Sequence, residues 1–307
     1  MTIYRMGLVC TLCTLGLAAS EPKSVAGYGN LPVHFESNQG QWDDGSLFAG
    51  IASRYRFAVD RQGFRLSLHT GGTIGFRFSQ SNPAASFALR DPLPGQSSYL
   101  LGPEARHHYK DIPHYRRVHA TAIYPGIDAV YYGRGNEVEY DFIVAPHASP
   151  DPISLRISGA SHVSLDSNGD LLLATHTGAV RQRKPVAYQW SGTRRQFVEA
   201  RYNLDNGAVS FALGPYDRNR PLIIDPSLAY SVFFNTGGFS HALSIEVDAQ
   251  GSAYVAGYVY DDGKNRGFVI KLNPAGTAVL SSLFFFGGFP TAIRLDAAGA
   301  AYIAGSS

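Results

Sequence analysis

The stretch IEVDAQGSAYVAG (residues 245–257) is followed 48 residues later by a second version, IRLDAAGAAYIAG (residues 293–305). A fixed period of this length is typical of repeat architectures. In each copy, apolar and polar residues alternate on both sides of an Asp-containing turn, which is the pattern of a β-hairpin. The stretch therefore predicts antiparallel strands that belong to a repeated unit.

The repeat extends beyond this hairpin. YSVFFNTGGF (residues 230–239) is echoed by SSLFFFGGF (residues 281–289), and RGFVIKLNPAGTAVL (residues 266–280) supplies another strand, turn and strand between them. One unit thus holds four strands in roughly 50 residues, the pattern of a β-propeller blade, which buries its faces against neighbouring blades. We expect an incomplete propeller of about one and a half blades over residues 228–307.

Composition narrows the class of protein. The chain has 307 residues, of which 16% are charged, 12% are aromatic and 33 are glycine, and its net charge is +2. Few charges and many glycines and aromatics favour strands and tight turns over surface helices. A nearly neutral chain gives no electrostatic reason to expect nucleic acid or an anionic membrane as a partner.

The first 20 residues resemble an export signal. Arg5 precedes the short apolar run MGLVCTLCTLGLAA, and small residues lie before Glu21. Both cysteines, Cys10 and Cys13, lie inside this segment, so the mature chain would have no disulfide or thiolate metal site. We expect a secreted or cell-surface protein with no membrane insertion after signal removal. A buried first helix is the alternative.

Turns that begin with Asp and end with Gly, here called Asp-to-Gly turns, recur along the mature chain. An Asp at the start of a turn accepts hydrogen bonds from the backbone, and a Gly at its end adopts positive φ. Each turn has one or two carboxylates, too few for a dedicated calcium loop, so a structural role is favoured over calcium binding. The five pairs are Asp60–Gly63, Asp166–Gly169, Asp205–Gly207, Asp248–Gly251 and Asp296–Gly299.

Two proline-rich segments suggest boundaries. RNRPLIIDPSLAYS carries Pro221 and Pro226 just before the first repeat, and APHASPDPIS (residues 145–154) holds three prolines. Prolines interrupt strand ladders, so these segments indicate linkers or switches between sheets. We expect an N-terminal all-β domain of sandwich-like character over residues 31–226, with a sub-boundary near 145–154.

In these repeat motifs the chain resembles bacterial secreted proteins with seven-bladed β-propeller (SBBP) repeats. Matching repeat positions include Asp248, Gly251, Tyr254 and Lys271, and the second copy retains Asp296, Gly299 and Tyr302. The N-terminal part is similar to a domain of unknown function that often precedes such repeats, through LPVHFESNQGQ, YPGIDAVYYG, EYDFIVAP, RQRKPVAYQ and YDRNRPLIIDP. The resemblance implies export and a propeller but no reaction. It departs where other members have an acidic GSGDD and this chain has GGFSHA and GGFPTA.

Two sets of residues are candidates for ligand binding. Glu137, Glu139 and Asp141 alternate in NEVEYDF, so on a strand they would share one face, where crowding could raise a pKa or hold a cation. Arg181 and Arg183 in RQRKP could meet anionic glycans. The alternatives are a solvated strand face paired with a basic neighbour, and an edge strand protected against aggregation.

Metal and nucleophile signatures are weak. His107, His108, His114 and His119 lie in a segment broken by Pro113, with no helical i, i+4 pair, so we predict no metal site. The chain has no G-x-S-x-G, S-x-x-K or H-E-x-x-H motif. Most of the 18 tyrosines and 18 phenylalanines are expected in the core, and any that line a groove would suit sugar stacking.

The sequence therefore favours a non-enzymatic interaction or structural scaffold without a cofactor, with glycans or extracellular proteins as partners. A polysaccharide-acting enzyme is the first alternative, and two carboxylates opposed across a cleft would distinguish it. A truncated fragment without independent function is the second.

Overall fold

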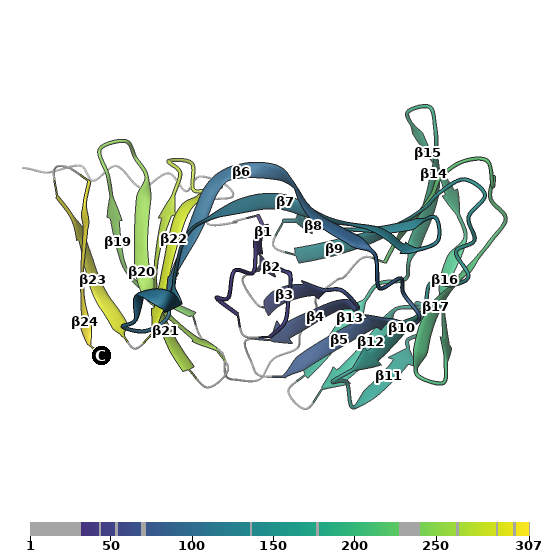
Figure 1. The fold of residues 1–307 in the computed structure, drawn as a ribbon, viewed down its shortest axis with the longest axis horizontal. Coiled ribbons are helices and arrows are strands. Elements are labelled where there is room, and N and C mark those ends of the chain that lie inside the picture. The colour runs from purple at the N-terminus through teal and green to yellow at the C-terminus, as the bar shows by residue number, and fades with distance from the viewer. Residues whose placement is uncertain are drawn as a thin grey trace, which may run out of the picture.

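A computed structural model describes residues 32–306 except 43, 53–54, 69–71, 136, 176–177, 227–239, 262–263, 287 and 297–298 (Figure 1). The described residues are strands joined by turns, with one 3-10 turn, η1 (Ala105–His107), so the all-β prediction is confirmed. The expected export signal lies outside the described residues. Among the residues that are described, no helix has the length and apolar character needed to cross a membrane.

The strands follow the alternating segments of the sequence. Those of the N-terminal region are β1 (His34–Ser37), β2 (Phe48–Ile51), β3 (Tyr55–Asp60), β4 (Gly63–Leu68), β5 (Thr73–Phe78), β6 (Ser86–Leu100), β7 (His108–Tyr124), β8 (Ile127–Arg134), β9 (Glu137–Val144), β10 (Leu155–Ser158), β11 (His162–Leu165), β12 (Leu171–Thr175), β13 (Gly178–Gln182), β14 (Val186–Ser191), β15 (Arg194–Val198), β16 (Ala200–Asp205), β17 (Ala208–Leu213) and β18 (Leu222–Asp225). The repeat region contributes β19 (Ser240–Val247), β20 (Ala253–Asp261), β21 (Lys264–Leu272), β22 (Val279–Phe286), β23 (Phe289–Leu295) and β24 (Ala301–Ser306).

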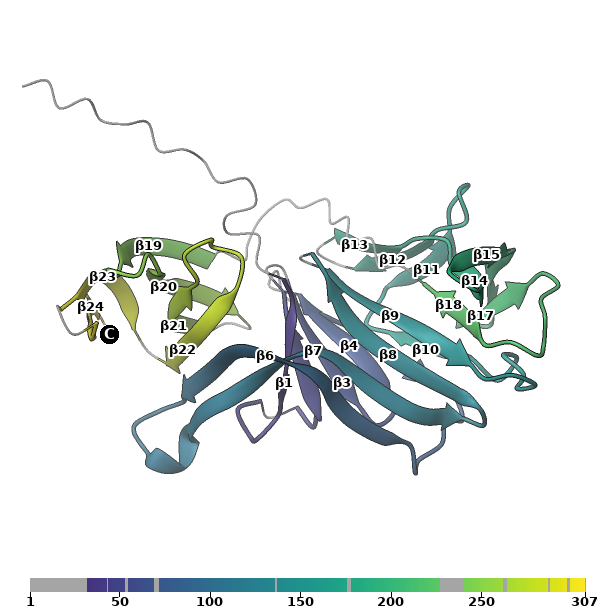
Figure 2. The same cartoon turned by 90° about the horizontal axis from the view of Figure 1, so that it is seen from above.

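Two layers of antiparallel sheet form the N-terminal region (Figure 2). One layer runs in the order β2-β3-β4-β5-β10-β17-β16, and the other in the order β6-β7-β8-β9-β18-β14-β15. Strand β1 joins them, because it pairs with β2 along its length and meets β7 where Phe35 faces Tyr115.

Aromatic side chains fill the space between the layers. The ring of Phe64 stacks on Phe76 with centroids 4.5 Å apart and meets Tyr140 of the facing layer at 4.7 Å. Phe57 meets Tyr131 across the same gap at 5.6 Å. All five rings are almost fully buried, in line with the expectation that most aromatics pack in the core.

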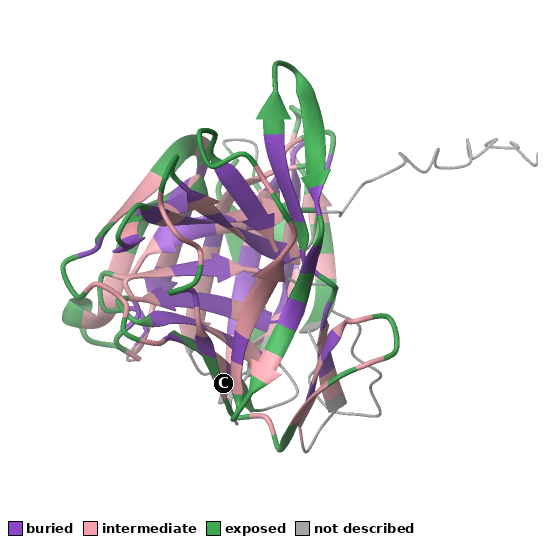
Figure 3. Cartoon of the chain, turned by 90° about the vertical axis from the view of Figure 1, so that its right-hand side faces the viewer, coloured by how far each residue is buried: buried purple, intermediate pink, exposed green. Residues whose placement is uncertain are grey.

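The small sheet β11-β12-β13 adds its apolar residues to this core. Leu171, Leu173 and Val180 are fully buried. The Gln182 amide, also buried, donates a 2.7 Å hydrogen bond to the Tyr140 hydroxyl. Most buried residues of the two layers form one cluster with these side chains, and exposed residues concentrate at hairpin tips and loops (Figure 3).

The repeat region forms a sheet of four antiparallel strands, β19 to β22. The hairpin β23–β24 packs on its face, and fully buried Ile293 contacts the cluster around Ala256 and Val269. This matches the predicted strand content of a blade, but the described residues form no closed propeller. Strand β22 pairs in parallel with β6, which attaches the repeat sheet to the N-terminal region (Figure 1).

The proline-rich segments lie side by side in space. Residues 145–154 turn the chain from β9 into β10, and the His147 N–H donates a 2.8 Å hydrogen bond to the Arg218 carbonyl oxygen in the loop before β18. The prolines thus interrupt strands at a corner where two loops contact each other. Residues 227–239, which follow Pro226, lie outside the described part of the chain.

Candidate functional site

The site is built on the outer surface of five neighbouring strands, β8, β9, β18, β14 and β15. Along β9, Val138, Tyr140 and Phe142 point into the core, so Glu139 and Asp141 point to the opposite side. Opposite residues in antiparallel strands share a face, which allows this surface to be followed from strand to strand. We call it the outer face.

Three carboxylates occupy the centre of the outer face. Ile224 of β18 pairs with Phe142, so the next residue, Asp225, lies beside Asp141, while Glu139 lies opposite Tyr132 of β8. The Tyr132 hydroxyl donates a 3.0 Å hydrogen bond to Asp141 Oδ1. Three acidic groups are therefore concentrated on two adjacent strands.

Two of these carboxyl groups have raised pKa values. Burial, followed by the charge of Asp225, raises the pKa of Asp141 to about 7. Burial and the charge of Asp225 also raise the pKa of Glu139, although Arg134 lies 3.5 Å from Glu139 Oε2 and opposes the shift. Carboxyl groups with shifted pKa values that lie close together on one surface are common at functional sites.

Aromatic side chains border the carboxylates. Val186 of β14 faces Asp225, and Tyr188 and Trp190 follow on the same side of that strand. Phe197 of β15 pairs with Tyr188. Trp190 is 47% exposed and Phe197 is 69% exposed, which is high for such large apolar side chains.

Arg195 connects the aromatic and acidic parts of the outer face. Arg195 of β15 faces Trp190, and its guanidinium carbon lies 4.4 Å from the ring centroid of Tyr188 and 5.3 Å from that of Trp190. Its charge also acts to lower the pKa of Asp141, against the larger effect of burial. The outer face thus presents flat apolar rings beside groups that can donate and accept hydrogen bonds.

Four of the five family-like motifs meet on this surface. YPGIDAVYYG supplies Tyr132, EYDFIVAP supplies Glu139 and Asp141, RQRKPVAYQ supplies Tyr188, and YDRNRPLIIDP supplies Asp225. The family described as a domain of unknown function, DUF7948, matches residues 35–227. The chain belongs to this family. No curated protein matches the chain.

The outer face lies entirely within the DUF7948 domain. The match confirms the sequence-based prediction of a domain of unknown function in the N-terminal part of the chain. Sequence reasoning found Glu139 and Asp141 from their alternation but missed Asp225, Tyr132, Tyr188, Trp190, Arg195 and Phe197. The available signal was that several of these residues lie in separate motifs of one family.

The remaining predicted ligand-binding residues lie apart from one another. Glu137 shares the outward side of β9 but pairs with Arg134 at the strand end. Arg181 reaches Asp170 at 3.5 Å and Asp166 at 3.7 Å, so its charge is used within the DUF7948 domain. Arg183 is exposed, and its carbonyl oxygen accepts a hydrogen bond from Tyr202.

The predicted histidine set does not assemble. His107 lies in η1, His108 lies 2.8 Å from the Gly102 carbonyl oxygen, and His119 lies 3.1 Å from Asp128 Oδ2. His114 alone is buried, on the side of β7 that meets β1. It contacts His34 and Glu36, which the sequence reasoning did not consider.

The Asp-to-Gly turns have backbone roles. Asp166 Oδ1 accepts hydrogen bonds from the N–H groups of Asn168 and Asp170, and Asp248 Oδ1 accepts them from Gln250 and Ser252. The terminal glycines have positive φ: Gly63, Gly169, Gly207, Gly251 and Gly299. These carboxylates are thereby occupied by the turns that contain them.

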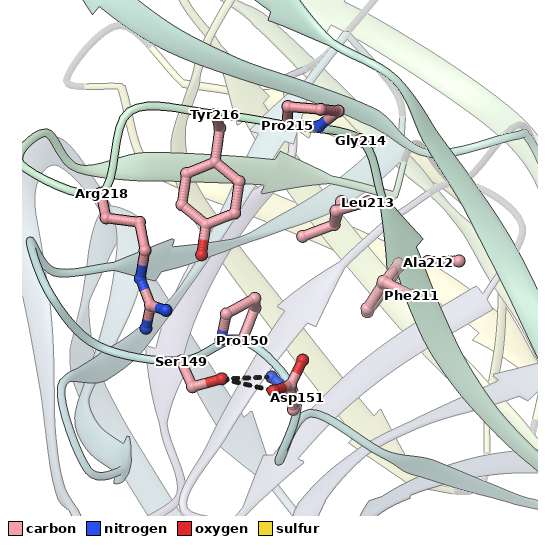
Figure 4. A pocket seen from close by; sticks show the side chains of 10 residues that line it. All are labelled: Ser149, Pro150, Asp151, Phe211, Ala212, Leu213, Gly214, Pro215, Tyr216 and Arg218. Carbon is pink, nitrogen blue, oxygen red and sulfur yellow. Dashed lines mark hydrogen bonds between the residues drawn. The ribbon is translucent and has the colours of Figure 1, made fainter.

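A shallow pocket of about 570 Å³ lies where the two proline-rich loops meet (Figure 4). Tyr216 and Arg218 lie on one side of it, Ser149 and Asp151 on the other, and the Ser149 hydroxyl donates a 2.7 Å hydrogen bond to Asp151. Its polar groups are few and partly paired with each other. The outer face is the better candidate, because two of its carboxyl groups have raised pKa values and the rings of Trp190 and Phe197 are exposed.

Proposed function

We propose that this protein is a secreted or cell-surface scaffold that binds neutral oligosaccharides on the outer face of its DUF7948 domain. The observation that carries the proposal is that Trp190 and Phe197, both exposed, lie on the same face of the sheet as Asp141 and Asp225. Sugar rings have apolar faces that pack on aromatic rings, and their hydroxyl groups hydrogen-bond to carboxyl groups. Arg195 supplies a further donor between the two parts.

The chemistry favours an uncharged ligand over an anion. An anionic glycan would face the three carboxylates Glu139, Asp141 and Asp225, and like charges at short range are unfavourable even with Arg134 and Arg195 nearby. A carboxyl group with a pKa near 7 is present in both protonation states at neutral pH, so Asp141 can donate as well as accept a hydrogen bond.

The repeat region supports the scaffold role. We propose that β19–β22 is a propeller blade of the SBBP type. The hairpin β23–β24 lies on one face, where Arg294 reaches Glu246 at 3.2 Å. Leu243, Ile245 and Val247, on the opposite side of β19, are 46–57% exposed. In a propeller, neighbouring blades cover both faces of each blade. Here the hairpin covers one face, and the apolar stripe on the other face is a surface that a further blade would cover.

Glycan-array screening of the full chain, followed by calorimetric titration of the oligosaccharides that bind, tests the function. Trp190→Ala and Phe197→Ala should each weaken binding at least tenfold. Tyr302→Ala is the matched control, because Tyr302 is 62% exposed on β24, away from the outer face, and its loss should leave the affinity unchanged. Equal affinity for all three variants, or no glycan binding at all, would contradict the proposal.

Glycoside hydrolysis is the second candidate, and the raised pKa of Asp141 beside Asp225 favours it. Retaining glycosidases use two carboxyl groups about 5 Å apart, one of them protonated. Here the two residues are neighbours on one sheet and do not oppose each other across a cleft, which favours binding alone. Chromatography of a bound oligosaccharide after long incubation distinguishes the two functions. A scaffold leaves the oligosaccharide intact. An enzyme that uses this pair cleaves it, and either substitution, Asp141→Asn or Asp225→Asn, abolishes the cleavage.

A further inference from the structure

A buried polar cluster lies where β1, β6, β7 and β22 meet, at the opposite end of the β6-β7-β8-β9-β18-β14-β15 layer from β14 and β15. Glu36 is fully buried and His114 is 1% exposed, while the His34 side chain is 12% exposed. Carboxylates and imidazoles are seldom buried this deeply without a specific partner. The cluster therefore needs a chemical explanation.

The local geometry follows from strand pairing. His34 and Glu36 alternate on β1 and so share a face. Phe35 pairs with Tyr115, which brings the preceding residue of β7, His114, beside Glu36. Gly95 of β6 makes room for the His114 ring, since a Cβ at this position would collide with it.

Three ligand-type atoms converge at this point. His34 Nε2 lies 3.0 Å from Glu36 Oε1, and His114 Nε2 lies 3.2 Å from the same oxygen. The three atoms lie within 4.8 Å of one another, which suits a single metal ion. For metal–ligand bonds of about 2.0–2.1 Å, the ligand atoms of a tetrahedral zinc site are about 3.3 Å apart.

We propose that His34, Glu36 and His114 bind a divalent transition-metal ion of the zinc class. Two imidazoles and one carboxylate are ligands that zinc accepts readily, whereas calcium and magnesium prefer all-oxygen sites. The Ser97 hydroxyl oxygen lies 2.7 Å from His114 Nε2, beside these three ligands. The proposal concerns a structural ion, because the ligands lie in the interior.

Outer-shell groups orient the carboxylate. The Tyr99 hydroxyl donates a 2.8 Å hydrogen bond to Glu36 Oε2, and the Ser97 hydroxyl donates to Oε1. Hydrogen bonds of this kind fix ligand orientation in known metal sites. Oε2 is held by Tyr99, so Oε1 is the oxygen directed toward the two imidazoles.

One adjustment is required. The rings of His34 and His114 stack with centroids 3.7 Å apart and planes 21° apart, so their nitrogen lone pairs run side by side. To share one ion, a ring must tilt. His34 is the ring with freedom to do so, because it is at the partly exposed edge of the cluster, whereas His114 is enclosed.

Metal content decides between an ion and a purely hydrogen-bonded cluster. The full chain, stripped with chelator and dialysed against Zn²⁺, should retain about one zinc per chain by mass spectrometry. Co²⁺ in place of zinc should give the visible absorption of a tetrahedral site. His34→Ala should lower zinc affinity at least tenfold, and it removes a ligand from the edge of the cluster without opening the core.

His119→Ala is the matched control, since His119 also lies on β7 but pairs with Asp128 outside the cluster. Its zinc content and affinity should equal those of the unmodified chain. His114→Ala should abolish binding, and circular dichroism establishes whether this more buried variant has folded. Zinc content well below one per chain, or zinc affinity unchanged in folded His34→Ala, would show that the cluster holds hydrogen bonds only.

Discussion

The hydroxyl oxygens of Ser97 and Ser282 lie 2.7 Å apart although the residues are separated by 185 positions in the chain. Ser97 belongs to β6 of the DUF7948 domain and Ser282 to β22 of the repeat sheet, which pair in parallel. The rings of Tyr99 and Phe284 stack beside them with centroids 5.3 Å apart. The repeat sheet thus continues a sheet of the DUF7948 domain, and one of its edges is covered by that domain.

Phe284→Ala should loosen this attachment. The substitution removes the stacking partner of Tyr99 and the apolar area buried with it, which should lower the free energy of unfolding by about 1–3 kcal/mol. Hydrogen exchange should accelerate in β22 and β6, with little change in β3 to β5. Tyr302→Ala is a suitable control, because its ring is mostly exposed on β24. Equal exchange rates in β22 for the unmodified and Phe284→Ala chains would mean that the pairing contributes little to docking.

Asp141→Asn should stabilise the protein at alkaline pH. The folded pKa of about 7 lies above the unfolded value of 3.8, so ionisation of Asp141 opposes folding. This unfavourable contribution is absent below pH 3.8, grows as the pH rises to about 7 and is constant above that. An uncharged amide avoids it, and we expect a gain of about 1–3 kcal/mol at pH 8 that disappears near pH 4.

Urea unfolding of the two proteins at pH 4, 6 and 8 measures this difference. Glu137→Gln, on the same strand, controls for the loss of one negative charge. A difference between Asp141→Asn and the unmodified chain that does not change with pH would indicate that packing or the Tyr132 hydrogen bond determines the effect.

Local patterns predicted local structure well. The alternation around DAQG and DAAG predicted the hairpins, and the alternation in NEVEYDF correctly placed Glu139 and Asp141 on one side of β9. Partners from distant strands could not be predicted in the same way. Asp225 meets Asp141 only because β18 pairs with β9, and that pairing depends on the packing of the whole domain. The buried histidine cluster was missed for the same reason, since His34 and His114 are 80 residues apart in sequence.

Gly63 and Gly169 should respond differently to substitution by valine, although both end an Asp-to-Gly turn. Both have positive φ, 151° and 83°, so a β-branched side chain is strained at either position. At Gly169 the nearest atom to an added Cβ is the Lys184 Cδ at 3.6 Å, an ordinary contact, so the cost is conformational and on the order of 1–3 kcal/mol. At Gly63 a Cβ would collide with the carbonyl oxygen of Phe76, so the backbone of two paired strands must move. Gly63→Val should therefore destabilise the protein more than Gly169→Val, by at least 1 kcal/mol in urea unfolding.

Added Ca²⁺ should not restore the stability of Gly169→Val, because Asp166 Oδ1 is occupied by backbone N–H groups. Recovery of several degrees in melting temperature with Ca²⁺, reversed by chelator, would show that this turn binds calcium.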